Sequence, residues 1–160
     1  MDIWTERLQR RHLPLLEAWV GRTDGAVTPN DLPADRAELT GWFDACAAEA
    51  GRRDYLITVY ETPVGVAGLR PSGENGAALY LLLGEVQYNL LRTATYAVQR
   101  MLDHAFQDPG CARVTVRADV RFPELLAAFA RMGFLCAAQD DGTALLSIEP
   151  DAFRQRKYLF

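Results

Sequence analysis

Four side chains that can transfer protons lie close together in the middle of the chain: Tyr80, Glu85, Tyr88 and Tyr96. A tyrosine hydroxyl can protonate a leaving group, and a carboxylate can accept a proton from an amine through water. Each also has an ordinary structural interpretation, because a buried tyrosine hydroxyl usually just finds a hydrogen-bond partner and a loop carboxylate is usually solvated. Each of these residues therefore admits two interpretations, acid–base chemistry and a structural role.

The elements that would position this cluster are a strand, a loop and a helix. Residues 77–83 form a continuous apolar run, which predicts a central strand covered on both faces. Residues 93–106 repeat apolar side chains at i, i+3 and i+4, which predicts an amphipathic helix. Glu85 and Tyr88 would then lie in the loop between the two.

The rest of the chain predicts an α/β (α+β) fold with about four main helices around a mixed sheet. Periodicity and turn residues predict helices at 12–20, 35–50 and 123–132, with a short one in 151–160. They predict further strands at 3–8, 55–60, 64–69, 112–118, 134–138 and 143–148. No repeat or linker divides the chain, so residues 1–160 are predicted to form a single domain.

Composition excludes several kinds of protein. The net charge is −4 without a basic block, which argues against nucleic acid as a partner. The longest apolar run is too short to cross a bilayer, and no signal peptide is visible. Cys46, Cys111 and Cys136 form no zinc-type pair and indicate a reducing compartment. We therefore expect a cytoplasmic protein with no bound metal.

Three local strings, in this order and spacing, resemble the GCN5-related N-acetyltransferase (GNAT) superfamily. Residues 15–19 look like the opening helix of its ribosomal-protein-acetylating branch. Residues 83–85, Tyr88 and residues 94–98 fall where the family has its strand, coenzyme loop and following helix. Residues 129–134 look like the Tyr-x-x-x-Gly-Phe end of its last core helix. The resemblance covers nearly the whole chain and implies a mostly antiparallel GNAT-like sheet.

The resemblance also implies a site for acetyl-coenzyme A or another acyl-coenzyme A. In the family, an Arg/Gln-x-x-Gly-x-Gly/Ala loop opens the long helix and holds the pyrophosphate with backbone N–H groups and the helix dipole. Here the loop is 89–94, and only Ala94 fits, because Asn89 and Arg92 replace the usual residues. Either Arg92 pairs with a phosphate, supported by Thr93, or this pocket has lost the pyrophosphate. The cofactor-binding residues implied are Leu81, Leu83, Asn89, Arg92, Thr93 and Ala94.

The family's usual acid is absent from its position. Many members protonate the departing thiolate with a tyrosine on the last core helix, but Phe129 stands there, and Phe122 stands where an asparagine is common. We interpret both phenylalanines as core residues. The role of acid would then fall to Tyr88 or Tyr96, with Tyr80 third, and Glu85 would act as the base.

The resulting functional prediction is transfer of an acyl group from acyl-coenzyme A to an amine of a small molecule or a peptide. Backbone N–H groups near residues 81–83 would stabilise the oxyanion. One alternative is an enzyme of the same fold that does not use coenzyme A. Another is a non-catalytic binding or dimerisation domain, because Trp4, Trp19 and Trp42 offer apolar surface as well as core. A homodimer is compatible with the prediction; a nucleic-acid or membrane partner is not.

Overall fold

The computed structural model describes residues 2–20, 28, 31–33, 35–84, 90–140 and 142–156. Strands β1 to β7 span Ile3–Arg7, Arg53–Val59, Thr62–Ser72, Gly76–Leu83, Arg113–Asp119, Leu135–Asp140 and Thr143–Ile148. Helices α1 to α5 span Leu13–Glu17, Leu39–Ala48, Leu90–Phe106, Pro123–Met132 and Pro150–Arg156. Short 3-10 turns, η1 at Arg10–His12 and η2 at Arg36–Glu38, precede α1 and α2. The predicted α/β fold class is confirmed.

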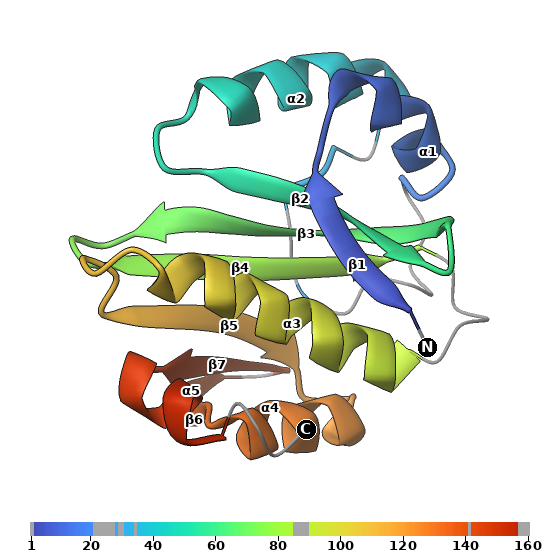
Figure 1. Ribbon diagram of the computed structural model, residues 1–160. Helices are drawn as coiled ribbons and strands as arrows, with labels where there is room; N and C mark the ends of the chain where they lie inside the picture. The colour runs from blue at the N-terminus through green and yellow to red at the C-terminus, as the bar shows by residue number, and fades with distance from the viewer. Residues whose placement is uncertain are drawn as a thin grey trace.

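The seven strands form one mixed sheet in the order β1-β2-β3-β4-β5-β7-β6 (Figure 1). Among the strand pairs described, β4 and β5 run parallel and the others antiparallel. The predicted central strand is confirmed, because β4 is the fourth of seven. Its side chains alternate between two apolar clusters. Leu79, Leu81 and Leu83 face α3, whereas Tyr80 and Leu82 face α1 and α2.

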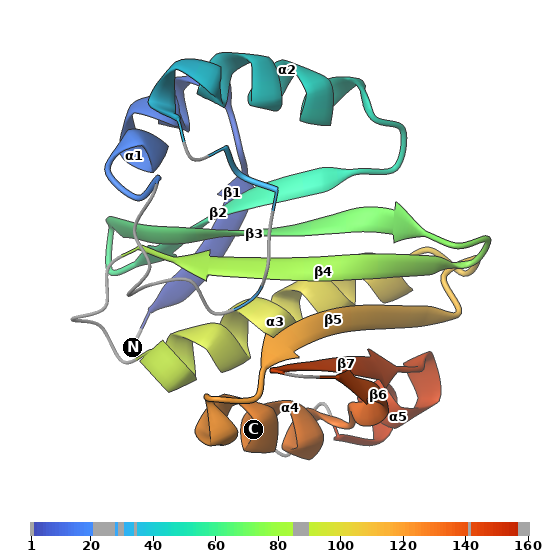
Figure 2. The ribbon, with the colours of Figure 1, turned by 180° about the vertical axis from the view of Figure 1, so that it is seen from behind.

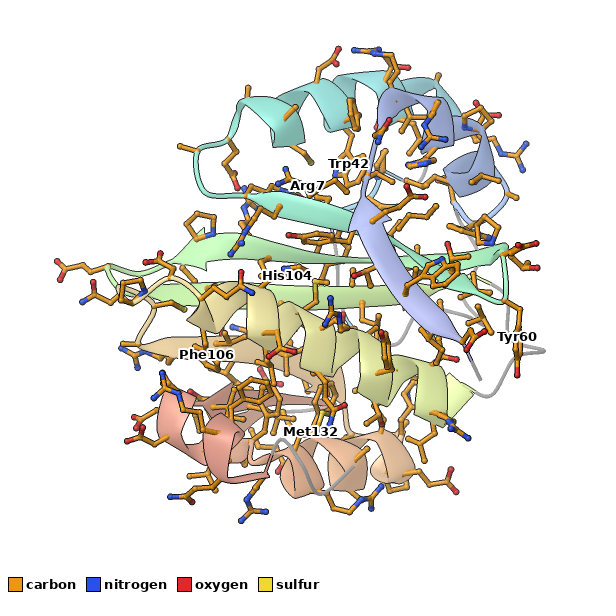
Figure 3. All side chains as sticks on the ribbon, in the orientation of Figure 1. Arg7, Trp42, Tyr60, His104, Phe106 and Met132 are labelled. Atoms are coloured by element: carbon orange, nitrogen blue, oxygen red, sulfur yellow. The ribbon has the colours of Figure 1, made fainter. Side chains whose placement is uncertain are left out.

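Helices cover the two faces unequally. On one face, α3, α4 and α5 pack along the sheet (Figure 1). Two side chains of this layer, Phe106 and Met132, are labelled in Figure 3, and Met132 is 2% exposed. On the other face, α1 and α2 lie over the part of the sheet nearest β2. Seen from behind, none of the described helices lies over β5 and β7 on this face (Figure 2).

Several boundaries differ from the predicted ones. The first helix is shorter than residues 12–20, because it begins as the 3-10 turn Arg10–His12 and α1 ends at Glu17. Pro14 sits in its first turn, where the missing N–H has no intrahelical partner. The C-terminal helix is confirmed as far as Arg156. The aromatic tail and most of the predicted loop at 21–33 lie outside the described residues.

Gly84, the residue after β4, is in close contact with Trp19. Gly84 lies directly against Trp19, which is 3% exposed, and a Cβ at Gly84 would be 2.1 Å from the Trp19 Cδ1 atom. Gly84→Ala should therefore lower the free energy of unfolding by about 1–3 kcal/mol through overpacking, measured by urea denaturation. Gly41→Ala is the matched control, because nothing lies within 4 Å of its Cβ position in α2. That helical position should gain roughly 0.5–1 kcal/mol. Equal effects of the two substitutions would contradict this packing.

Candidate active site

The parallel strands β4 and β5 are paired along only part of their length. Their ladder runs from Gly76–Arg113 to Leu79–Val116 and stops there, although β4 continues to Leu83 and β5 to Asp119. The Gly84 N–H donates to the Val64 carbonyl at 2.7 Å, so the alternation of an antiparallel pair turns the Leu81 and Leu83 backbone groups away from β3. These groups face the β5 side, where the two strands have separated.

Thr28 meets this edge of β4. Its backbone N–H donates to the Leu81 carbonyl at 3.2 Å, and its hydroxyl donates to the same oxygen at 3.1 Å. The Leu81 N–H in turn donates to the Thr28 hydroxyl at 2.6 Å. Thr28 is 4% exposed. One side chain from the segment between α1 and α2 thus satisfies both backbone groups of Leu81.

Several of the predicted site residues belong to the segment between β4 and α3. Glu85, Tyr88 and Asn89 lie outside the described residues. Helix α3 begins at Leu90, and its first turns carry the exposed Arg92 and the buried Thr93 and Ala94. The Thr93 Oγ1 atom is buried without a hydrogen-bond partner among the described residues. A buried polar atom in this state costs free energy unless it is satisfied, so the Thr93 hydroxyl requires a partner from outside the described residues.

The two described tyrosine candidates have different surroundings. Tyr96 is partly buried on α3 and packs against the larger apolar cluster. Tyr80 is 7% exposed, and its hydroxyl donates to Asp54 Oδ1 at 2.6 Å. Burial first, and then the charge of Asp54, raises the pKa of Tyr80 well above its ordinary value. These contacts support a structural role for the Tyr80 hydroxyl.

A charge network centred on the buried Arg52 lies beside Tyr80, and it was not predicted from the sequence. Arg52 donates to both oxygens of Asp31, at 2.6 and 2.8 Å, and its Nε lies 3.1 Å from Asp54 Oδ2. The Arg52 side chain is only 4% exposed. Its guanidinium carbon also lies 5.7 Å from the centre of the Trp42 ring, and Trp42 Nε1 donates to Asp31 at 3.2 Å. Trp42 belongs to α2 and lies on the side of the helix that faces the sheet (Figure 3). The hydrogen bonds from Arg52 are the main cause of a lowered pKa at Asp31.

Neither a metal site nor a membrane-spanning helix is found within the described part of the chain. No group of three or more His, Cys, Asp or Glu side chains among these residues could hold a metal ion. None of the helices in the described ranges is both long and apolar enough to cross a membrane.

The family follows from a direct comparison. Residues 4–135 match the family model of the acetyltransferase (GNAT) domain. The chain belongs to the GNAT acetyltransferase family. The comparison with curated proteins finds no match.

Solved GNAT structures share the fold at low sequence identity. One is a chimera of the spermidine N-acetyltransferase SpeG from Vibrio cholerae and hSSAT. It is 12% identical, with a TM-score of 0.80 over 98% of this chain and 100% of that chain. Another is the aminoglycoside acetyltransferase AAC(6')-Ib in complex with coenzyme A. It is 14% identical, with a TM-score of 0.77 over 98% of this chain and 99% of that chain. The seven-stranded GNAT architecture is thus retained in full.

Within this GNAT domain, the two phenylalanines discussed above have opposite environments. Phe129, at the position of the family tyrosine, is 0% exposed and packs edge-on against Phe134 at 5.1 Å between ring centres. Its prediction as a core residue is confirmed. The same prediction for Phe122 is wrong, because its side chain is 42% exposed. Phe122 is the N-cap of α4, outside the first helical turn, so the helix does not direct its ring into the core.

Proposed function

We propose that this chain is an acyl-coenzyme A-dependent N-acyltransferase that transfers an acetyl group to an amine. The main support is the separation of β4 and β5 after Leu79–Val116 in a chain of the GNAT family. Beyond that pair the backbone groups of Leu81 and Leu83 face the β5 side. Those of Leu81 are bound by Thr28, so the N–H of Leu83 is the donor that we propose for the site. Fixed backbone donors of this kind can stabilise the oxyanion that forms in acyl transfer.

The described residues at the start of α3 fit an anionic coenzyme. Arg92 supplies a cation, Thr93 supplies a hydroxyl without a partner in the described part of the structure, and the helix N-terminus favours negative charge. Asn89 and Ala94 complete the proposed pyrophosphate site, and Leu81 and Leu83 line the thioester end. When bound, acetyl-coenzyme A would supply the acetyl group as a reactive thioester.

The proposed reaction needs one base and one acid. A neutral amine attacks the thioester carbonyl, so that a C–N bond forms as the C–S bond breaks. Glu85 takes the proton of the amine through a water molecule, and Tyr88 or Tyr96 gives a proton to the departing thiolate. Tyr80 is the least favoured acid of the three, because its proton is already shared with Asp54.

Binding of acetyl-coenzyme A to Arg92→Ala tests the proposed coenzyme site. Loss of a charged hydrogen-bond donor should weaken binding roughly 10-fold or more in calorimetry. Arg100→Ala is the matched control on the same helix, since Arg100 is half-exposed and lies 3.9 Å from Asp103. Its binding should equal that of the unmodified protein. Equal binding by Arg92→Ala would reject the phosphate-binding role of Arg92.

One observation favours a second function. Because Thr28 satisfies both backbone groups of Leu81, an enzyme of this fold that works without coenzyme A is the alternative. A complete lack of acetyl-coenzyme A binding, even at millimolar concentration, would favour this alternative.

Two finer assignments accompany the proposal. The support for the ribosomal-protein-acetylating branch is the resemblance of residues 15–19 to the opening helix of that branch. A cytoplasmic location is supported by the three cysteines, which form no disulfide within the described residues.

A further inference from the structure

A pocket of about 440 Å³ opens on the face of the sheet that α3 does not cover. On β5, Thr115 and Arg117 point into it and alternate with Val114 and Val116, which belong to the core beneath α3. On β4, Ala78 and Tyr80 line the same pocket. Its wall includes Leu79 and Val116, the last pair of the β4–β5 ladder. The pocket therefore reaches the point where the two strands separate, and the face that carries it is seen in Figure 2.

The charged residues that line this pocket are three arginines and one aspartate: Asp31, Arg52, Arg70 and Arg117. Asp31 is already paired, because both of its carboxylate oxygens accept hydrogen bonds from Arg52. Asp54, behind the wall, is also committed to Arg52 and Tyr80. No carboxylate of the described lining is thus left without a cation, and a cationic ligand would have to break an existing pair.

The hydrogen-bond donors of the pocket have fewer partners than its carboxylate. Arg70 donates through Nε and Nη2 to one oxygen of Glu49, at 3.2 and 3.0 Å, while its Nη1 lies 3.7 Å from Asp31. Arg117 is exposed, and its guanidinium has no ion pair or hydrogen bond within the described residues. Thr115 and Ser72 add hydroxyl groups to the same lining. The polar side chains of the lining that remain available are therefore the Arg117 cation and two hydroxyl groups.

The positive character continues along β5. A neighbouring pocket of about 190 Å³ shares Ser72 and Thr115 and is lined by Arg113. Arg113 and Arg117 lie on the same face of the strand, with Thr115 between them, because side chains alternate along a strand. This face of β5 thus presents two arginines, Arg113 and Arg117, beside the separation of β4 and β5.

We propose that the amine accepted by this enzyme also carries an anionic group, a carboxylate or a phosphate, which binds to Arg117 in this pocket. The inference rests on the proposed acyl transfer and assigns its substrate class. The planar guanidinium of Arg117 can hold either anion through two parallel hydrogen bonds. The amine end would then lie toward the separated strands, where the thioester is expected. Such a substrate contrasts with the spermidine and the aminoglycosides that the similar structures are named for.

Binding of an anion without an amine separates this inference from the proposed function. Propionate, which cannot be acetylated, is titrated into the full chain without coenzyme while backbone amide signals are followed by NMR at constant ionic strength. We expect shifts at Thr115 and Arg117. In Arg117→Gln, the apparent affinity for propionate should be at least about 10-fold lower. Arg154→Gln, which removes an exposed arginine on α5 paired with Asp151, is the control and should bind propionate unchanged.

Turnover then tests the substrate class. With acetyl-coenzyme A, β-alanine and 2-aminoethyl phosphate should give a higher kcat/KM than the uncharged β-alaninamide or the cation spermidine. Arg117→Gln should remove that preference, mainly through KM. Absence of propionate shifts in this pocket, or equal shifts in Arg117→Gln, would overturn the inference whether or not acetyl transfer occurs. A preference for spermidine would also overturn it. Propionate binding without transfer to any amine would support the anion site and reject the proposed function.

Discussion

Arg52→Ala should lower the free energy of unfolding by about 3–5 kcal/mol, because it removes the shared partner of Asp31 and Asp54. Asp54 is 8% exposed and would become a buried carboxylate whose remaining side-chain partner, among the residues that the structure describes, is the Tyr80 hydroxyl. Denaturation in urea at pH 7 measures the loss. A change in the transition midpoint with an unchanged slope would indicate lower stability of the same folded state.

A matched substitution separates this network from ordinary surface pairing. Arg70 pairs with Glu49 at 3.0 Å, but its side chain is 53% exposed, so Arg70→Ala should cost less than about 1 kcal/mol. The pH dependence gives a second check. Since Arg52 lowers the pKa of Asp31 in the folded protein, its stabilising contribution is present above the ordinary carboxyl pKa of about 4 and is lost as pH falls below it. The difference between the unmodified protein and Arg52→Ala should shrink at acid pH. A constant difference would contradict the charge-based explanation.

Removal of the proposed acid should produce the largest effect on rate. We expect either Tyr88→Phe or Tyr96→Phe to lower kcat about 10²–10⁴-fold with the fold intact, because a general acid contributes a factor of this size. Tyr80→Phe should mainly reduce stability, since it leaves Asp54 without its hydrogen bond of 2.6 Å. Turnover of the three variants with one amine substrate measures the contrast.

Tyr60→Phe is the control for these variants, since Tyr60 is 57% exposed in the turn after β2 (Figure 3). It should keep full activity. If Tyr88→Phe, Tyr96→Phe and Tyr80→Phe all keep full activity as well, the acid assignment is wrong. The thiolate would then leave unassisted, which its pKa of about 8.5, by analogy with a cysteine thiol, permits.

The fold could be predicted because local sequence patterns specify most of its helices and strands. The apolar run of residues 77–83 specifies a buried central strand, and the i, i+3, i+4 repeat of residues 93–106 specifies α3. The C-terminal end of the first helix is harder to predict. Leu13, Leu16 and Trp19 are all buried as in a helix, but the chain leaves α1 at Glu17 and places Trp19 through a turn. A periodic pattern predicts which side chains are buried more reliably than where a helix ends.

The charged part of the site depends on contacts that no local pattern encodes. Arg52 and Asp54 are neighbours on one strand, but Asp31 and Tyr80 reach them from distant segments of the chain. The one local signal is Asp54, a charge that directly precedes the largely apolar residues 55–59 of β2, because a buried charge requires a partner. The contact of Thr28 with Leu81 is likewise set by tertiary structure. Phe122 was misassigned because its apolar character predicts burial, whereas its place before α4 leaves it exposed.

Acetyl transfer itself is the most direct test of the proposed function. The full chain is incubated with acetyl-coenzyme A and β-alanine, β-alaninamide or spermidine in turn. Thiol release and the mass of each amine are then followed together. We predict that thiol release is accompanied by an equal amount of singly acetylated amine, with β-alanine the preferred acceptor. Absence of acetylated product for every amine, at coenzyme concentrations that saturate any binding seen by calorimetry, would contradict the proposed function.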